Sequence, residues 1–145
     1  MTTVFQGLDA DGAERGFTLD DFKGKTTVLY FYPKDNTSGC TKEACDFRDS
    51  MNRIAPKATV VGVSPDSVKS HDGFRRKQGL NFVLLSDPDH ALAERFGAWG
   101  EKTMCGKKRF GVIRSTFILD AEGTVVKEWR KVKVAGHVDE ILNSL

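Results

Sequence analysis

The stretch from residue 26 to residue 54 constrains the fold most, because its pattern is that of a buried strand followed by a helix. Thr26–Tyr32 consists of β-branched and aromatic residues with one Leu, and is almost continuously apolar, which is typical of a strand buried on both faces. Pro33 has no N–H to give to a sheet and is expected to end this strand. In Thr41–Ile54 the apolar residues recur at spacings of three and four, which predicts an amphipathic helix. The polar loop between strand and helix delivers Cys40 to the expected helix start.

The rest of the sequence alternates between predicted strands and helices. We expect an N-terminal β-hairpin with its turn at residues 9–12, and a short helical turn at Thr18–Phe22. Further strands are predicted at Thr59–Ser64, Asn81–Leu85, Ser115–Leu119 and Thr124–Val132, and further helices at Ser67–Gln78, Asp89–Phe96 and Val138–Leu145. Such alternation implies parallel strand pairing, with the last hairpin antiparallel. The pattern therefore predicts an α/β fold, a central mixed β-sheet flanked by helices, in a single domain spanning residues 1–145.

The composition is that of an ordinary globular protein. Charged residues make up 29% of the chain and hydrophobic residues 39%. The net charge of +2 gives no reason to expect a nucleic acid or an anionic membrane as partner. No apolar run approaches the roughly 20 residues of a membrane helix, and no signal-peptide pattern is visible. Three cysteines, an odd number, argue against a secreted disulfide scaffold, so we expect a cytoplasmic protein.

Cys40 and Cys45 admit several interpretations. A cysteine is often a small buried hydrophobe. Structural zinc needs about four closely spaced ligands, and His71, His90 and His137 form no such cluster in the sequence. A permanent disulfide is disfavoured, because residues five apart on an intact helix lie roughly 7.5 Å apart along its axis, beyond the usual reach of about 7 Å between Cα atoms. A reactive thiolate, which a helix N-terminus stabilises, and a transient disulfide remain open.

The segment Tyr32–Cys45 resembles the active-site segment of the peroxiredoxins, most of all the bacterioferritin comigratory protein group, or Q type. Pro33, Thr37 and Cys40 match the family motif Pro-x-x-x-Thr-x-x-Cys. Arg114, in the run Arg-Ser-Thr-Phe, matches a distant arginine that the family needs at the start of a strand. The likeness covers nearly the whole chain, and the combination of motif and distant arginine makes it specific.

This resemblance implies a thioredoxin-like fold and a thiol-dependent peroxidase acting on hydrogen peroxide and organic hydroperoxides. Cys40 would attack the peroxide and become a sulfenic acid, and Cys45 would resolve it as an intramolecular disulfide that thioredoxin or a similar dithiol reduces. Arg114 can stabilise the thiolate and the leaving oxygen, Thr37 offers a hydroxyl to peroxide and sulfur, and Pro33 shapes the pocket. The resemblance implies no cofactor and no metal, and a monomer is expected.

Some features depart from this pattern or stay outside it. Ser38 stands where the family usually has proline, Cys105 lies where an aromatic is more usual and is interpreted as an incidental thiol, and the N-terminus is short. Glu43 is interpreted as a first-turn acid that the helix dipole favours, not as a catalytic residue. The alternatives on the same fold are a thiol–disulfide oxidoreductase, which usually has Cys-x-x-Cys, and a non-enzymatic thiol sensor, which needs neither Arg114 nor Thr37.

Overall fold

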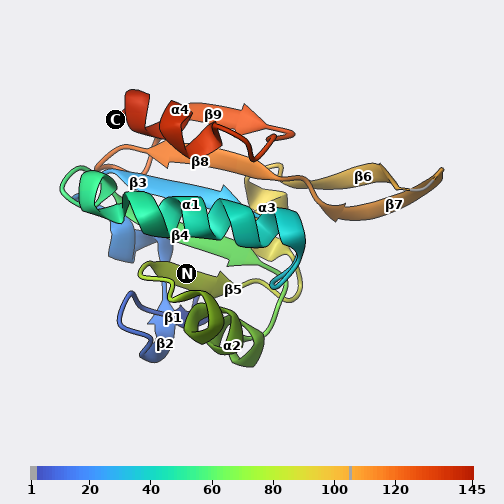
Figure 1. The fold of residues 1–145 in the computed structure, drawn as a ribbon, viewed down its shortest axis with the longest axis horizontal. Helices are drawn as coiled ribbons and strands as arrows, with labels where there is room; N and C mark the ends of the chain where they lie inside the picture. Colours follow the sequence, from blue (N-terminus) through green and yellow to red (C-terminus); the bar gives the residue numbers. More distant parts are fainter. Residues whose placement is uncertain (1–2, 105) are drawn as a thin grey trace.

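A mixed β-sheet with helices on both faces forms the body of the protein (Figure 1). The computed structural model describes residues 3–104 and 106–145. Its strands are β1 (Phe5–Leu8), β2 (Glu14–Phe17), β3 (Thr27–Phe31), β4 (Thr59–Ser64), β5 (Val83–Ser86), β6 (Trp99–Met104), β7 (Lys107–Val112), β8 (Ser115–Leu119) and β9 (Val125–Arg130). Its helices are α1 (Ser38–Ile54), α2 (Val68–Gln78), α3 (Ala91–Arg95) and α4 (His137–Asn143), with a 3-10 turn, η1, at Leu19–Phe22.

Seven of these strands form one sheet in the order β2-β1-β5-β4-β3-β8-β9. Strands β3, β4 and β5 pair in parallel, and the remaining pairs are antiparallel. The sheet is therefore mixed, and the N-terminal hairpin β1–β2 lies at one edge, as the sequence predicted. Since the parallel strands β3 and β4 end on the same side, the loop that follows β3 emerges at the carboxyl edge, where ligands bind in such sheets.

Two apolar cores lie on opposite faces of the sheet, and β3 contributes to both. Val28 and Tyr30 point to the face covered by α1, α2 and α4, whereas Leu29 and Phe31 point to the face covered by α3. All five residues of β3 are buried, which confirms the prediction of a strand enclosed on both sides. The strand is thus held rigidly, and so is the point from which the Cys40 loop begins.

Most predicted elements exist, with boundaries shifted by a few residues. Helix α1 begins at Ser38, three residues before the predicted Thr41, because Thr37 is already the N-cap. Helix α2 follows Ser67, whose hydroxyl accepts from the Ser70 N–H, and it ends at Gly79, whose φ of 65° suits glycine. Helix α3 is shorter than the predicted Asp89–Phe96. Within the described part of the chain, no helix is long and apolar enough to cross a membrane.

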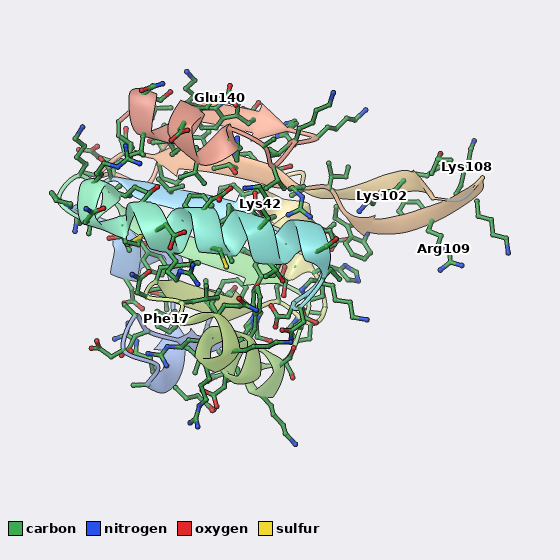
Figure 2. All side chains as sticks on the ribbon, in the orientation of Figure 1. Phe17, Lys42, Lys102, Lys108, Arg109 and Glu140 are labelled. Atoms are coloured by element: carbon green, nitrogen blue, oxygen red, sulfur yellow. The ribbon has the colours of Figure 1, made fainter. Side chains whose placement is uncertain are left out.

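Strands β6 and β7 form a two-stranded arm that the sequence patterns did not predict. The arm projects from the body, and Figure 2 shows Lys108 and Arg109 near its far end and Lys102 closer to the body. Phe110 on the same arm is 70% exposed. The arm was missed because it buries no continuous face, so its residues show no regular alternation of apolar and polar types.

Candidate active site

Cys40 is the third residue of α1, on the turn that follows the carboxyl end of β3. Cys40 is 2% exposed and packs in the core between α1 and the sheet. Thr37 caps the helix in an extended conformation, and its carbonyl accepts from the Thr41 N–H. The first-turn N–H groups of a helix lack intrahelical partners and carry partial positive charge. The sulfur of Cys40 therefore lies at the positive end of the helix dipole.

Arg114 joins Cys40 to Glu43 through its two terminal nitrogens. One nitrogen donates to Cys40 Sγ at 3.1 Å, and the other donates to Glu43 Oε1 at 2.6 Å. Burial lowers the pKa of the Arg114 guanidinium, but Glu43 and Cys40 outweigh this effect and leave the pKa above its ordinary value. The arginine is thus a permanent cation, and its side chain is only 17% exposed.

Glu43 is a fully buried acid that sequence reasoning left outside the site. Desolvation raises the pKa of Glu43 from 4.5 to about 7, although Arg114 acts in the opposite direction. Its Oε1 accepts from Arg114, and its Oε2 has no hydrogen-bond partner among the described residues. A signal existed in the sequence: Glu43 lies three positions after Cys40, on the helix face that also carries Ala44 and Phe47 into the core.

Pro33 and Arg114 line one cavity of about 470 Å³ beside the sulfur. The arm and the segments before β8 and after β9 supply its other lining residues: Glu101, Lys102, Thr103, Ile113, Lys131 and Val132. Burial, and then Arg114, lower the pKa of Lys102, whose ammonium donates to the Val112 carbonyl at 2.7 Å. The cavity therefore has cationic, acidic and apolar walls, and Arg114 connects it to Cys40.

Thr37 is near the site, but its hydroxyl donates to the Lys34 carbonyl at 2.9 Å and not to Cys40. The residue is exposed, and its oxygen keeps lone pairs that can accept from a ligand. The bond to Lys34 closes the loop in front of the helix. Thr37 is not among the residues that line the Arg114 cavity, and the role of its hydroxyl toward peroxide stays a prediction.

Cys45 is half-buried and lies on a different side of α1 from Cys40. Five residues carry a helix about 140° beyond one full turn, at about 100° per residue. The Cys45 thiol donates to Gln78 Oε1 on α2 at 3.6 Å, and both cysteines are free. As long as α1 stays intact, it therefore keeps the two sulfur atoms apart. Cys105 lies outside the described residues.

The comparison with known proteins agrees with this geometry. A sequence model of the AhpC/TSA family matches residues 3–128. The chain belongs to the AhpC/TSA family. Peroxiredoxin Bcp of Bacillus subtilis (strain 168) is 56% identical over 128 residues, which cover 88% of this chain and 82% of the relative. The putative peroxiredoxin bcp of Coxiella burnetii is 50% identical over 129 residues, 88% of this chain and 85% of the relative.

A solved structure points to the same peroxiredoxin group. A mutant of peroxiredoxin Q from Xanthomonas campestris aligns with a TM-score of 0.87 and 48% identity, covering 96% of this chain and 88% of that one. The predicted resemblance to Q-type peroxiredoxins and the predicted thioredoxin-like fold are therefore confirmed. Peroxiredoxins are thiol-dependent peroxidases, so the chain is an oxidoreductase of that class.

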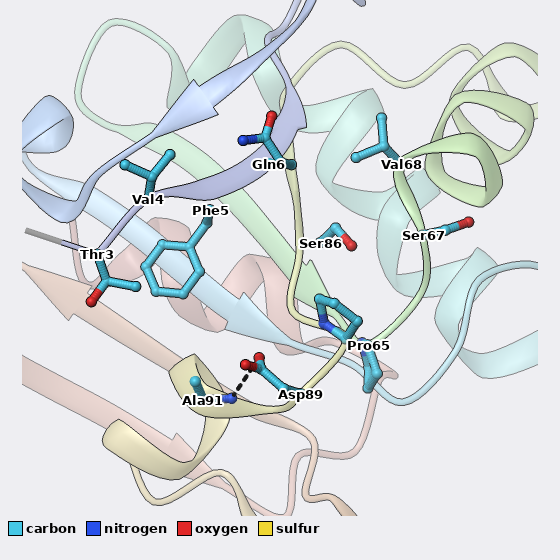
Figure 3. Close-up of a pocket in the computed structure, with 11 residues that line it drawn as sticks. Thr3, Val4, Phe5, Gln6, Pro65, Ser67, Val68, Ser86, Asp89 and Ala91 are labelled. Carbon is cyan, nitrogen blue, oxygen red and sulfur yellow. Dashed lines mark hydrogen bonds between the residues drawn. The ribbon is translucent and has the colours of Figure 1, made fainter.

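A second cavity of this peroxiredoxin, also about 470 Å³, lies between β1 and the segments that follow β4 and β5 (Figure 3). Figure 3 shows Phe5 and Pro65 among its lining side chains, and the Ala91 N–H donating to Asp89 Oδ1. None of the residues predicted for catalysis lines it. Of these two cavities, only the Arg114 cavity is lined by residues predicted for catalysis.

Proposed function

We propose that this peroxiredoxin reduces hydrogen peroxide and organic hydroperoxides with Cys40 as its nucleophile. The observation that supports this most directly is the contact of 3.1 Å between Arg114 and Cys40 Sγ, at the first turn of α1 and beside a cavity. A solved structure of the Xanthomonas campestris bacterioferritin comigratory protein, 47% identical, is described in terms of alkyl peroxide reduction activity. Substrates of the same class are proposed for this chain.

In the first step, the Cys40 thiolate attacks one peroxide oxygen as the O–O bond breaks. The sulfur is oxidised to sulfenic acid, the peroxide is reduced, and the leaving alkoxide or hydroxide takes up a proton to become an alcohol or water. Arg114 is placed to stabilise the negative charge that moves from sulfur to the leaving oxygen. Pro33 excludes water from one side, and Thr37 offers its hydroxyl to the peroxide from the loop before α1.

In the second step, the Cys45 thiol condenses with the sulfenic acid at Cys40, forming an S–S bond and releasing water. The first turn of α1 must unwind for this, since an intact helix holds the two Cα atoms too far apart. Thioredoxin or a similar dithiol then transfers two electrons to the disulfide and restores both thiols. We propose that a monomer completes this cycle.

Steady-state peroxide consumption with thioredoxin as reductant tests the proposal. The parent should turn over hydrogen peroxide and an organic hydroperoxide, and Cys40→Ser should abolish turnover of both. A matched control is Ser50→Ala on the same helix, which should leave turnover intact. Activity that survives in Cys40→Ser would contradict the assignment. Exchange of disulfides without peroxide consumption would instead favour a thiol–disulfide oxidoreductase.

A further inference from the structure

A buried polar network ties the loop before Cys40 to helix α2. Asp35 lies in the middle of this loop, is 4% exposed, and has both carboxylate oxygens occupied. The Tyr32 hydroxyl donates to Oδ1 at 2.7 Å, and Ser70 Oγ donates to Oδ2 at 2.8 Å. His71 Nδ1 lies 2.7 Å from the same Oδ2. Burying a carboxylate is costly unless its oxygens are hydrogen-bonded, and these bonds hold the loop in place.

Both ring nitrogens of His71 contact protein atoms, and the side chain has no exposed surface. Its Nε2 lies 2.8 Å from the Leu85 carbonyl, which can only accept, so this nitrogen carries a hydrogen. The contact between His71 and Asp35 is enclosed, since the two side chains are 0% and 1% exposed. It links the loop to α2 and β5 at once. Because every nitrogen of His71 and every carboxylate oxygen of Asp35 has a protein partner, the cluster acts as an anchor.

The backbone of the loop is held as well. The Asp35 N–H donates to Asp66 Oδ2 at 2.7 Å, and the same oxygen accepts from Ser64 Oγ at 2.7 Å. The next residue, Asn36, has a φ of 62°, in the left-handed region that asparagine adopts more readily than most residues. The anchor at Asp35 therefore fixes the geometry that leads into Thr37 and Cys40.

Helix α2 makes a second attachment at its other end. The Cys45 thiol donates to Gln78 Oε1 at 3.6 Å, and Arg48 donates to the Gln78 backbone carbonyl. Helices α1 and α2 cover the same face of the sheet (Figure 1). Two contacts on α2, at His71 and at Gln78, thus bracket the stretch from Asp35 to Arg48. That stretch contains the turn that must unwind for Cys40 to reach Cys45.

We infer that α2 is a clamp that sets the balance between the two steps of the cycle, with Asp35, His71 and Gln78 as positioning residues. The Asp35–His71 anchor holds Cys40 in its reactive place and opposes unwinding. Gln78 keeps the Cys45 sulfur facing α2 until the turn opens. The part played by Gln78 rests on the proposed role of Cys45, whereas the part played by Asp35 rests on Cys40 alone.

The test measures the two steps separately. The rate of peroxide attack is followed by stopped flow in a Cys45→Ser background, where no Cys40–Cys45 bond can form. The rate of disulfide formation is followed in the parent background by acid quenching, alkylation and mass spectrometry. The variants are Asp35→Asn, the near-isosteric Tyr32→Phe and Ser70→Ala, and Gln78→Leu. Asp72→Asn, on α2 but outside the network, is the matched control.

Loosening the anchor should slow peroxide attack and speed disulfide formation, which a general loss of stability would not do. We expect changes of about tenfold for Asp35→Asn and about threefold for Tyr32→Phe and Ser70→Ala, since small displacements of a reacting group are costly. Gln78→Leu should leave attack unchanged and speed disulfide formation about threefold, the effect of one weak hydrogen bond. Asp72→Asn should match the parent in both steps.

The opposite results overturn the inference. If the anchor variants attack peroxide at the parent rate, or if both steps slow together, α2 is not a clamp. If Asp35→Asn does not fold, Tyr32→Phe and Ser70→Ala decide the matter, because each removes a single hydroxyl. If the parent forms no Cys40–Cys45 bond, the proposed role of Cys45 and the role of Gln78 both fail, while the attack rates still decide the role of Asp35.

Discussion

At the scale of single residues, the proposed chemistry depends on Arg114 contacting two partners at once. Its two terminal nitrogens contact Cys40 and Glu43, which lie 74 and 71 residues away in the chain. The guanidinium presents donors in a fixed fork, so one cation can serve a sulfur and a carboxylate at once. Glu43 fixes one side of the fork, and the other side then points at the sulfur. This one arrangement therefore brings a buried positive charge to the Cys40 sulfur in a fixed direction.

Arg114→Ala should slow peroxide attack about 10²–10³-fold, the usual cost of removing one donor to a developing negative charge. Arg114→Lys should recover only part of the rate, because an ammonium cannot contact both partners as a fork does. Stopped-flow rates with hydrogen peroxide measure this, with Arg109→Ala on the exposed arm as control. An alanine variant as fast as the parent would exclude a catalytic role for the arginine.

Glu43 should make stability depend on pH in a definite direction. Its pKa rises on folding from 4.5 to about 7, so the native state binds a proton more tightly than the unfolded state. The contribution of Glu43 protonation to the free energy of unfolding is fully present below pH 4.5 and is lost as pH rises through about 7. At 1.36 kcal/mol per pKa unit, the loss is up to about 3 kcal/mol.

Urea unfolding of the parent and of Glu43→Gln across this pH range checks the prediction. The parent's free energy of unfolding, relative to the variant's, should fall between pH 4.5 and about 7 and then level off. Glu122→Gln, at an exposed acid in the turn between β8 and β9, is the control. A constant gap between the parent and Glu43→Gln would mean that Glu43 does not titrate in this range.

At the scale of elements, the sequence predicted well wherever burial imposed a pattern. Strand β3 and helix α1 both stood out because each contributes a regular apolar face to a core. The β6–β7 arm was missed because it buries no such face. The contact between Glu43 and Arg114 was not predicted, because an acid in the first turn of a helix has an ordinary explanation in the dipole and only the fold brings Arg114 beside it.

The first turn of α1 should be the element that changes during the cycle. In Cys45→Ser, peroxide should still react once, but the sulfenic acid at Cys40 should persist and then take up further oxygen to the sulfinic acid. Intact-mass measurement with increasing peroxide follows these additions. Cys105→Ser is the control and should cycle as the parent does. A Cys40–Cys105 bond or a disulfide-linked dimer as main product of the parent would make Cys45 dispensable.

At the scale of the whole molecule, a rigid sheet carries one segment that can open. The central strands β3, β4 and β5 are buried on both faces and register with one another along their lengths. The Cys40 turn lies at their carboxyl edge, held by side chains from α2 and by Arg114. Helix ends open locally at little free-energy cost, while core strands open only with the whole protein. Oxidation can therefore unwind the turn without disturbing the sheet.

Hydrogen exchange of the reduced and the peroxide-treated protein tests this division. In the oxidised form, amides of residues 41–45 should exchange about tenfold faster or more, because the Cys40–Cys45 bond forbids the intact first turn. Amides of β3, β4 and β5 should keep their protection. Cys45→Ser treated with one equivalent of peroxide cannot form this bond, so its α1 amides should exchange as slowly as in the reduced parent. Faster exchange throughout the sheet would show that closing the disulfide loosens the whole fold, and unchanged exchange in α1 would show that the bond forms without unwinding.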